Sequence, residues 1–191
     1  MTYKKLRSLI LVWVVFGLLI ATSASGCNSQ GRNKVDESLT ETSARATIID
    51  YMSRTLGTLP PGVSLRLSPP KPEFGGTFNP GTVAPCNDND HDATGPVDLA
   101  INYWINGISS SAFDETLRSV LQVWRSWGWS TEENNAPGYL NAKARTPDGY
   151  TLIIDNNRVG GFSVTGASPC FPRKNAGTAI PQPEAIEHPT R

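Results

Sequence analysis

Three short runs in the second half of the chain alternate apolar and polar residues, with only short connections between them. The runs are residues 140–145, 150–154 and 162–164. Residues 147–149 (Pro-Asp-Gly) are typical of a hairpin turn in which Gly supplies the positive φ, and Asn156-Asn157 marks a second turn. Parallel neighbours would need crossover connections of a dozen or more residues. The pattern therefore predicts an antiparallel meander.

Two segments carry apolar residues at helical spacing. Residues 41–59 form the first, with Thr40 or Thr42 as the cap, and its stripe is Ala44, Ile48, Tyr51, Met52, Thr55, Leu56 and Leu59. Residues 110–127 form the second, which Gly128 can end, and its stripe is Phe113, Leu117, Val120, Leu121 and Trp124. Both segments are predicted to be helices with one face against a core.

The remaining elements complete a mixed fold. Residues 63–67 and 97–105 alternate in the manner of strands, and the Pro- and Gly-rich segment 68–96 between them is a long loop that contains Cys86. The order of elements predicts an α+β two-layer sandwich. In it, an antiparallel sheet of about five strands is covered on one face by two helices.

The N-terminus has the three zones of an exported protein. Lys4, Lys5 and Arg7 give a positive start without acidic residues, and residues 9–20 are apolar. This apolar run is too short to span a membrane, which takes about 20 residues. Residues 1–26 are therefore predicted to be a secretory signal.

Small residues fill positions 21–26 and are followed by Cys27. The arrangement resembles the bacterial lipobox, in which the Cys is diacylated and the chain is cut before it, although Ala24 stands where that motif prefers Leu. An ordinary signal peptide followed by a coincidental Cys is the alternative. We expect an anchor at Cys27 on the extracytoplasmic face of the cell membrane, because two acyl chains hold a protein stably.

The chain after the signal divides into three parts. Residues 27–40 are polar and are predicted to be a lipidated, flexible tether. Residues 41–172 are predicted to form a single globular domain, and about 165 mature residues suit one domain. Residues 173–191 are rich in Pro and charge, so a disordered tail is predicted there.

Charge and cysteine content fit an exported domain. The signal takes three basic residues and no acidic one, which leaves 14 basic against 17 acidic residues. A net charge of about −3 provides no electrostatic footprint for nucleic acid. Besides Cys27 the chain has Cys86 and Cys170, and two thiols in an oxidising compartment indicate one disulfide. A metal site or a catalytic thiol is the alternative.

Four short motifs resemble the small mycobacterial LppA-type lipoproteins over roughly residues 40–172. They are Pro85-Cys86-Asn87-Asp88, Gly128-Trp129, Pro147-Asp148-Gly149-Tyr150 and Ser168-Pro169-Cys170. The resemblance implies a lipid-anchored envelope protein of actinobacterial type in which Cys86 and Cys170 are paired. It implies no activity.

Trp104 and Trp127 are candidate ligand-contacting residues. Both fall off the core parity of their segments, so they are predicted to lie at the surface, where Trp is favoured in recognition. Core packing, which is the more common role of large aromatic side chains, is the leading alternative for each.

Asp88 and Asp92 are the second pair of candidates, within the run Asn-Asp-Asn-Asp-His-Asp. The run resembles a calcium loop, but Ala93 and Leu99 stand where such a loop needs Gly and an acid. A solvated acidic turn is therefore predicted, with no dedicated metal site. Asp88 and Asp92 could still hold a weak cation together with backbone carbonyls.

The sequence contains no recognisable catalytic motif. The letters of Ser68-x-x-Lys71 match a serine–lysine signature, but two prolines between them prevent the helical turn that this chemistry needs. No catalytic residue and no cofactor are predicted. The leading hypothesis is a non-enzymatic module whose loop 69–97 and neighbouring aromatics contact an envelope lipid, glycan or protein. The alternatives are a cell-wall or lipid hydrolase that uses Asp88, Asp92 or His91, and a subunit of an envelope complex.

Overall fold

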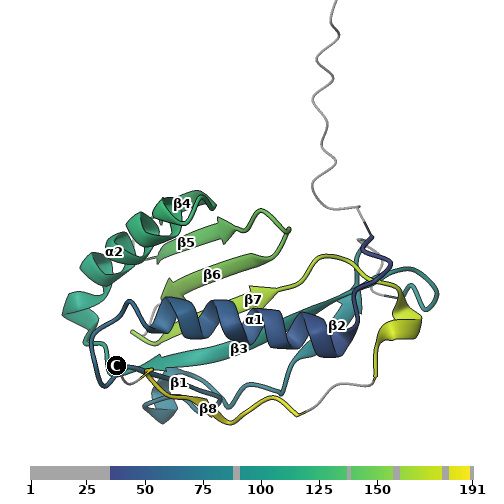
Figure 1. The fold of residues 1–191 in the computed structure, drawn as a ribbon. Helices are drawn as coiled ribbons and strands as arrows, with labels where there is room; N and C mark the ends of the chain where they lie inside the picture. Colours follow the sequence, from purple (N-terminus) through teal and green to yellow (C-terminus); the bar gives the residue numbers. More distant parts are fainter. Residues whose placement is uncertain (1–34, 88–90, 137–138, 157–159, 178–180, 190–191) are drawn as a thin grey trace, which may run out of the picture.

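The computed structural model describes residues 35–87, 91–136, 139–156, 160–177 and 181–189, which contain two α-helices and eight strands (Figure 1). The helices are α1 (Glu41–Leu56) and α2 (Phe113–Ser126). The strands are β1 (Ser64–Arg66), β2 (Thr82–Pro85), β3 (Val97–Asn106), β4 (Ser130–Ala136), β5 (Tyr139–Arg145), β6 (Thr151–Asn156), β7 (Phe162–Ala167) and β8 (Ala185–Ile186). The predicted signal and Cys27 lie outside the described residues.

Helix α1 begins where its cap was predicted. The Thr40 hydroxyl accepts a hydrogen bond from the Ser43 backbone N–H at 3.2 Å, and the Ser43 hydroxyl accepts one from the Thr40 N–H at 3.1 Å. This reciprocal capping box satisfies two backbone donors at the helix start. The buried stripe of α2 is the one that the sequence predicted: Phe113, Leu117, Val120, Leu121 and Trp124.

The strands form one antiparallel sheet in the order β4-β5-β6-β7-β3-β1-β8, with β2 also paired to β3. β1 and β2 share the edge of β3 that faces away from β7, because Trp104 and Ala100 each pair on both sides. The predicted α+β class is confirmed. The described sheet has more strands than the five or so expected, and β2 and β8 are too short to show alternation.

Both helices pack on the same face of the sheet. A β carbon on Gly166 of β7 would meet Ile48 and Met52 of α1, and Phe113 of α2 stacks on Phe162 of β7 with ring centroids 3.9 Å apart. Figure 1 shows α1 running along β3 and β7 and α2 lying beside β4 and β5. The apolar core fills the space between helices and sheet.

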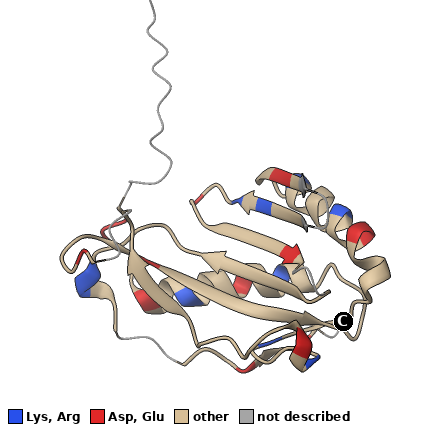
Figure 2. Ribbon diagram, turned by 180° about the vertical axis from the view of Figure 1, so that it is seen from behind, with Lys and Arg blue, Asp and Glu red and all other residues tan. Residues whose placement is uncertain are grey.

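Neither α1 nor α2 covers the opposite face of the sheet, which Figure 2 shows from behind. Polar side chains pair across its strands: Ser163 donates to Asp155 at 2.7 Å and Thr165 donates to Asn102 at 2.6 Å. In this view acidic and basic residues are scattered and do not gather in one patch. No helix among the described residues is long and apolar enough to cross a membrane.

Both ends of the domain are more ordered than the sequence suggested. Val35 forms a bridge with Cys170, and the Asp36 N–H donates to the Cys170 carbonyl at 2.8 Å, so the last residues of the predicted tether pack on the domain. At the other end, β8 pairs with β1 and Gln182 is buried. Residues 173–177 and 181–189 of the predicted tail thus make contacts with the domain. The composition of this segment could not predict its contacts, because they are made with residues far away in the sequence.

Candidate functional site

The end of α2 places the half-buried Trp127 indole at the surface of the helical layer, beside the buried indole of Trp129. Trp127 caps the helix, and Gly128 follows at φ +79°. The Gly128 N–H donates to the Arg125 carbonyl at 3.0 Å, and the Trp129 N–H donates to the Trp124 carbonyl at 3.1 Å. This is a Schellman motif, whose left-handed position favours Gly. The turn brings the Trp129 ring within 5.0 Å of Trp127, edge to face.

Helix α1 supplies two side chains to this aromatic cluster. The exposed Arg54 guanidinium lies over the half-buried Trp127 indole, 4.0 Å from the ring centroid. Such a cation–π contact contributes about 0.5–1 kcal/mol at an exposed site. The Tyr51 ring meets Trp129 edge to face at 5.1 Å and Tyr150 at 5.7 Å. Tyr51 is thus held by packing on two sides.

The turn between β5 and β6 brings a carboxylate to the Tyr51 hydroxyl. This hydroxyl lies 3.0 Å and 2.9 Å from the two Asp148 carboxylate oxygens and donates to them. The buried Thr146 hydroxyl donates to Asp148 Oδ1 at 2.5 Å and accepts from the Tyr150 N–H at 2.9 Å. Two donors therefore fix the exposed Asp148 carboxylate, which keeps acceptor sites for a ligand because a carboxylate offers about four.

The electrostatics of this contact keep the phenol protonated. Burial, followed by the hydrogen bond and negative charge of Asp148, raises the pKa of Tyr51 to about 12. The Tyr51 phenol therefore stays protonated, and keeps donating to Asp148, to a higher pH than a free tyrosine would. Together with Arg54, the site offers acceptors, donors and aromatic faces, which are the groups that bind a polar ligand.

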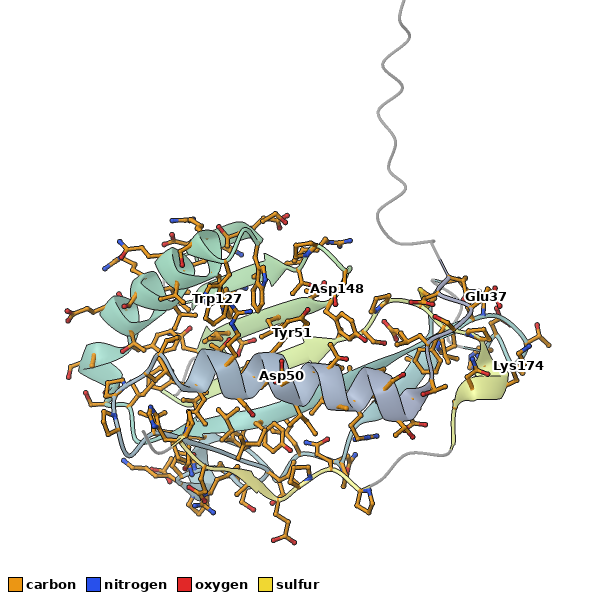
Figure 3. All side chains as sticks on the ribbon, in the orientation of Figure 1. Glu37, Asp50, Tyr51, Trp127, Asp148 and Lys174 are labelled. Atoms are coloured by element: carbon orange, nitrogen blue, oxygen red, sulfur yellow. A yellow bond between two sulfur atoms is a disulfide. The ribbon has the colours of Figure 1, made fainter. Side chains whose placement is uncertain are left out.

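We call this region the Tyr51–Trp127 surface, defined as Asp50, Tyr51, Arg54, Trp127 and Asp148. Figure 3 shows its labelled members on one side of the molecule, where α1, the end of α2 and the β5–β6 turn meet, with Glu37 and Lys174 at the far end. Asp50 is exposed and precedes Arg54 by one helical turn. Of these five residues the sequence had indicated only Trp127. Tyr51 was assigned to the core stripe and Asp148 to a turn.

Trp104 does not lie at the surface as predicted. It points away from the helical layer, as the alternation indicated, but it is 5% exposed. Phe78 stacks on its ring at 4.9 Å, and its indole N–H donates to the Gly76 carbonyl at 3.0 Å. The segment from Gly75 to Phe78 thus covers this indole on the otherwise open face of the sheet.

Asp92 stabilises the turn that follows it in the sequence. Its carboxylate accepts from the backbone N–H groups of Thr94 and Gly95, both at 2.9 Å, and from the Asn87 side chain. These bonds, led by the one from Thr94, hold the pKa of Asp92 well below its usual range. The Arg173 guanidinium also donates to the Asp92 carbonyl at 2.6 Å. Asp92 is thus a local structural anchor for the 92–95 turn.

The other members of the predicted acidic cluster add little to this picture. Asp88 lies outside the described residues, and His91 is exposed. Among the described residues no group of three His, Cys, Asp or Glu side chains could hold a metal ion. The described hydrogen bonds of Asp92 are with Asn87, residues 94–95 and Arg173, none of which was a predicted site residue.

Cys86 and Cys170 form the predicted disulfide, with their Cα atoms 6.1 Å apart. The bridge joins the long loop, at the residue after β2, to the segment after β7. The Cys86 N–H also donates to the Pro96 carbonyl at 3.0 Å. The loop is pinned as expected, and two of its segments, β2 and Gly75–Phe78, lie against the sheet.

A cleft of about 680 Å³ opens beyond the end of α1, between residues 57–63 and 187–189. Its two ionisable residues have internal partners. Glu187 pairs with Arg66 at 2.6 Å, and the His188 Nε2–H donates to the Leu59 carbonyl at 3.0 Å. Both contacts hold the C-terminal segment in place, so this cleft offers fewer available polar groups than the Tyr51–Trp127 surface.

No match to this chain was found among protein families, curated proteins or solved structures. The functional argument therefore rests on the residues and their geometry.

Proposed function

We propose that this chain is a lipid-anchored binding module of the bacterial cell envelope and that the Tyr51–Trp127 surface contacts its ligand. The observation that carries the proposal is the convergence of three separate elements on a Trp, a Tyr, an Arg and an oriented carboxylate. Trp, Tyr and Arg are the residue types that supply most of the binding energy at recognition surfaces. The motifs that resemble LppA-type lipoproteins support the same envelope assignment.

The proposed anchor is inferred from the N-terminal sequence, and its reach is limited by the length of chain that precedes Val35. Seven residues separate Cys27 from Val35, where the chain joins the domain beside Cys170. At about 3.5 Å per residue these eight steps reach at most about 28 Å. The proposed anchor would therefore hold the disulfide end of the domain near the membrane and leave the flank with Trp127 accessible.

Membrane fractionation tests the anchor. The full chain, expressed in an actinobacterial host, is expected to partition with membranes and to need detergent for release. The Cys27→Ala variant is expected to leave the membrane fraction, and the mass of the mature N-terminal peptide should show acyl groups on Cys27 in the wild type. Equal partitioning of both proteins would contradict the anchor.

Site-specific crosslinking tests the binding function in the same cells. A photoreactive phenylalanine analogue in place of Trp127 is expected to capture a ligand on illumination, whereas the same analogue in place of Phe74, on the far side of the sheet, should not. Capture at neither position, or equally at both, would contradict a ligand-binding role for the Tyr51–Trp127 surface.

A further inference from the structure

We propose that the Tyr51–Trp127 surface binds a neutral oligosaccharide of pyranose rings, with Trp127 as the stacking platform and Asp148 as the hydroxyl acceptor. This inference rests on the proposed binding function and names its ligand class. Four features of the described residues lead to it: the cover on the indole, the orientation of the carboxylate, the local charge and the scarcity of apolar surface.

The first feature is the flat group already seated on Trp127. The Arg54 guanidinium occupies the indole face at 4.0 Å from the centroid, at the end of an exposed and flexible side chain. A planar, weakly held group marks a face that a sugar ring can take, because the C–H bonds of a pyranose stack on an aromatic ring in the same way. When displaced, Arg54 remains beside the ligand as a donor of up to five hydrogen bonds.

The second feature is the preorganised carboxylate. Asp148 is exposed, yet Tyr51 and Thr146 hold it in one orientation. Neighbouring hydroxyl groups of a sugar can both donate to the two oxygens of one carboxylate. Because the carboxylate is already ordered, the ligand does not bear the entropic cost of fixing it.

The third feature is charge. Asp50 and Asp148 outnumber Arg54 on this surface, and the mature chain has 14 basic against 17 acidic residues. An anionic ligand such as a phosphate or a uronic acid would meet net repulsion there. A neutral sugar meets no such repulsion.

The fourth feature concerns apolar surface. Among the described residues Val83 is the one large hydrophobic side chain in the exposed class, and it lies on β2, outside this surface. Acyl chains and amphipathic helices bind grooves or patches of apolar side chains. A half-buried Trp beside polar groups suits a ligand that is itself mostly polar with apolar C–H faces.

The test measures binding to the lipidated full-length protein in a zwitterionic detergent that carries no sugar headgroup. The probes are the tetrasaccharides of N-acetylglucosamine, glucose and mannose. Their binding is measured by calorimetry and by the change in Trp fluorescence. We expect at least one probe to bind and to change the Trp emission. Trp127→Ala should weaken that binding at least tenfold, equivalent to about 1.4 kcal/mol, and Trp127→Phe should restore most of it.

Two further variants separate the roles within the surface. Asp148→Asn is expected to weaken binding severalfold, whereas Glu132→Gln, an exposed carboxylate on β4 away from this surface, should leave it unchanged. Arg54→Ala removes the cover from the indole but also a donor, so it should alter the fluorescence change more than the affinity. Each variant must show the thermal midpoint of a folded protein before its binding is compared.

Binding that survives Trp127→Ala would overturn the site, and no binding by any probe would overturn the ligand class. The crosslinking experiment then distinguishes the two levels of the proposal. Capture of a protein or lipid by the analogue at position 127 would keep the binding function and reject the sugar. Absence of any capture would reject both.

Discussion

The indole N–H of Trp124 on α2 donates to the Thr55 hydroxyl on α1 at 3.0 Å, and both side chains are buried. This bond joins the two helices directly across the core. Replacing Thr55 by Val keeps the shape of the side chain but leaves a buried donor unsatisfied, which costs about 1–3 kcal/mol. Urea unfolding should show that loss, with Thr55→Ser recovering part of it. Thr58→Val, at an exposed site, should cost less, and equal losses for Thr55→Val and Thr58→Val would contradict the argument.

The disulfide closes a loop of 84 residues between Cys86 and Cys170. In the chain-entropy treatment a loop of this length stabilises the fold by about 4–5 kcal/mol. A Cys86→Ser/Cys170→Ser double variant should lose most of that in urea unfolding, and reductant should bring the wild type to the same midpoint. A wild-type midpoint that is insensitive to reductant would show that the bridge contributes little.

Gly166 of β7 faces α1 directly. A β carbon there would overlap Ile48 Cγ2 and lie 3.0 Å from Met52 Cε. Overpacking of a filled core typically costs about 1–3 kcal/mol, so Gly166→Ala should lower the thermal midpoint. Gly76→Ala is the matched control, because a β carbon at Gly76 meets no atom within 4 Å. Similar thermal midpoints for the two variants would mean that α1 can move to make room for the added methyl group at little cost.

Tyrosine ionisation should make stability fall at high pH. The pKa values of Tyr51 and Tyr103 are raised from 10.0 to about 12, in both cases chiefly by burial. Their contribution is therefore complete below pH 10 and is lost as the pH rises from 10 to 12, where the unfolded chain has released protons that the folded protein retains. Absorbance at 295 nm and urea midpoints across this range should show it. Tyr51→Phe should reduce the slope, and an unchanged slope would contradict a raised pKa at Tyr51.

Asp148→Asn separates the two causes of the Tyr51 shift. Removing the carboxylate should lower the pKa of Tyr51, yet leave it above 10, because burial is the larger cause. A titration of the variant that matches the wild type would show that Asp148 does not contact Tyr51 in solution.

Local pattern predicted most of the regular structure. The stripe from Phe113 to Trp124 and the alternation in β5, β6 and β7 each express a face buried against the core, and this is a property of neighbouring residues. The strands β2 and β8 are held by pairing with distant residues, such as Val83 with Leu99 and Leu65 with Ile186. A strand of two to four residues is too short for an alternation of apolar and polar residues to predict it.

The candidate site was less predictable because its contacts are long-range. Tyr51 and Asp148 are 97 positions apart, and nothing in the sequence around either residue predicts that the two are in contact. For Trp104 the alternation predicted the correct face of the sheet, but the prediction that the side chain is exposed was wrong. The sequence placed it on the face away from the helices, but it could not show that the Gly75–Phe78 segment folds back over that face.

The C-terminal segment should be essential for stability, contrary to what its composition suggests. The Gln182 side chain is buried, accepts from Arg45 and donates to the Asn102 carbonyl, each at 3.4 Å. The Tyr103 hydroxyl donates to the Pro183 carbonyl at 2.7 Å. Arg45 is itself buried, and its Nε has no hydrogen-bond partner among the residues that the structure describes.

Gln182→Ala removes one acceptor from this buried guanidinium, so we expect a loss of about 1–3 kcal/mol in urea unfolding. Removal of residues 181–191 should cost more, because it also exposes the β1 edge and the Tyr103 hydroxyl. Glu187→Gln serves as the control: its ion pair with Arg66 is largely exposed, and such pairs contribute about 0–1 kcal/mol. If Gln182→Ala and the truncation both unfold at the wild-type midpoint, the segment does not pack on the domain in solution.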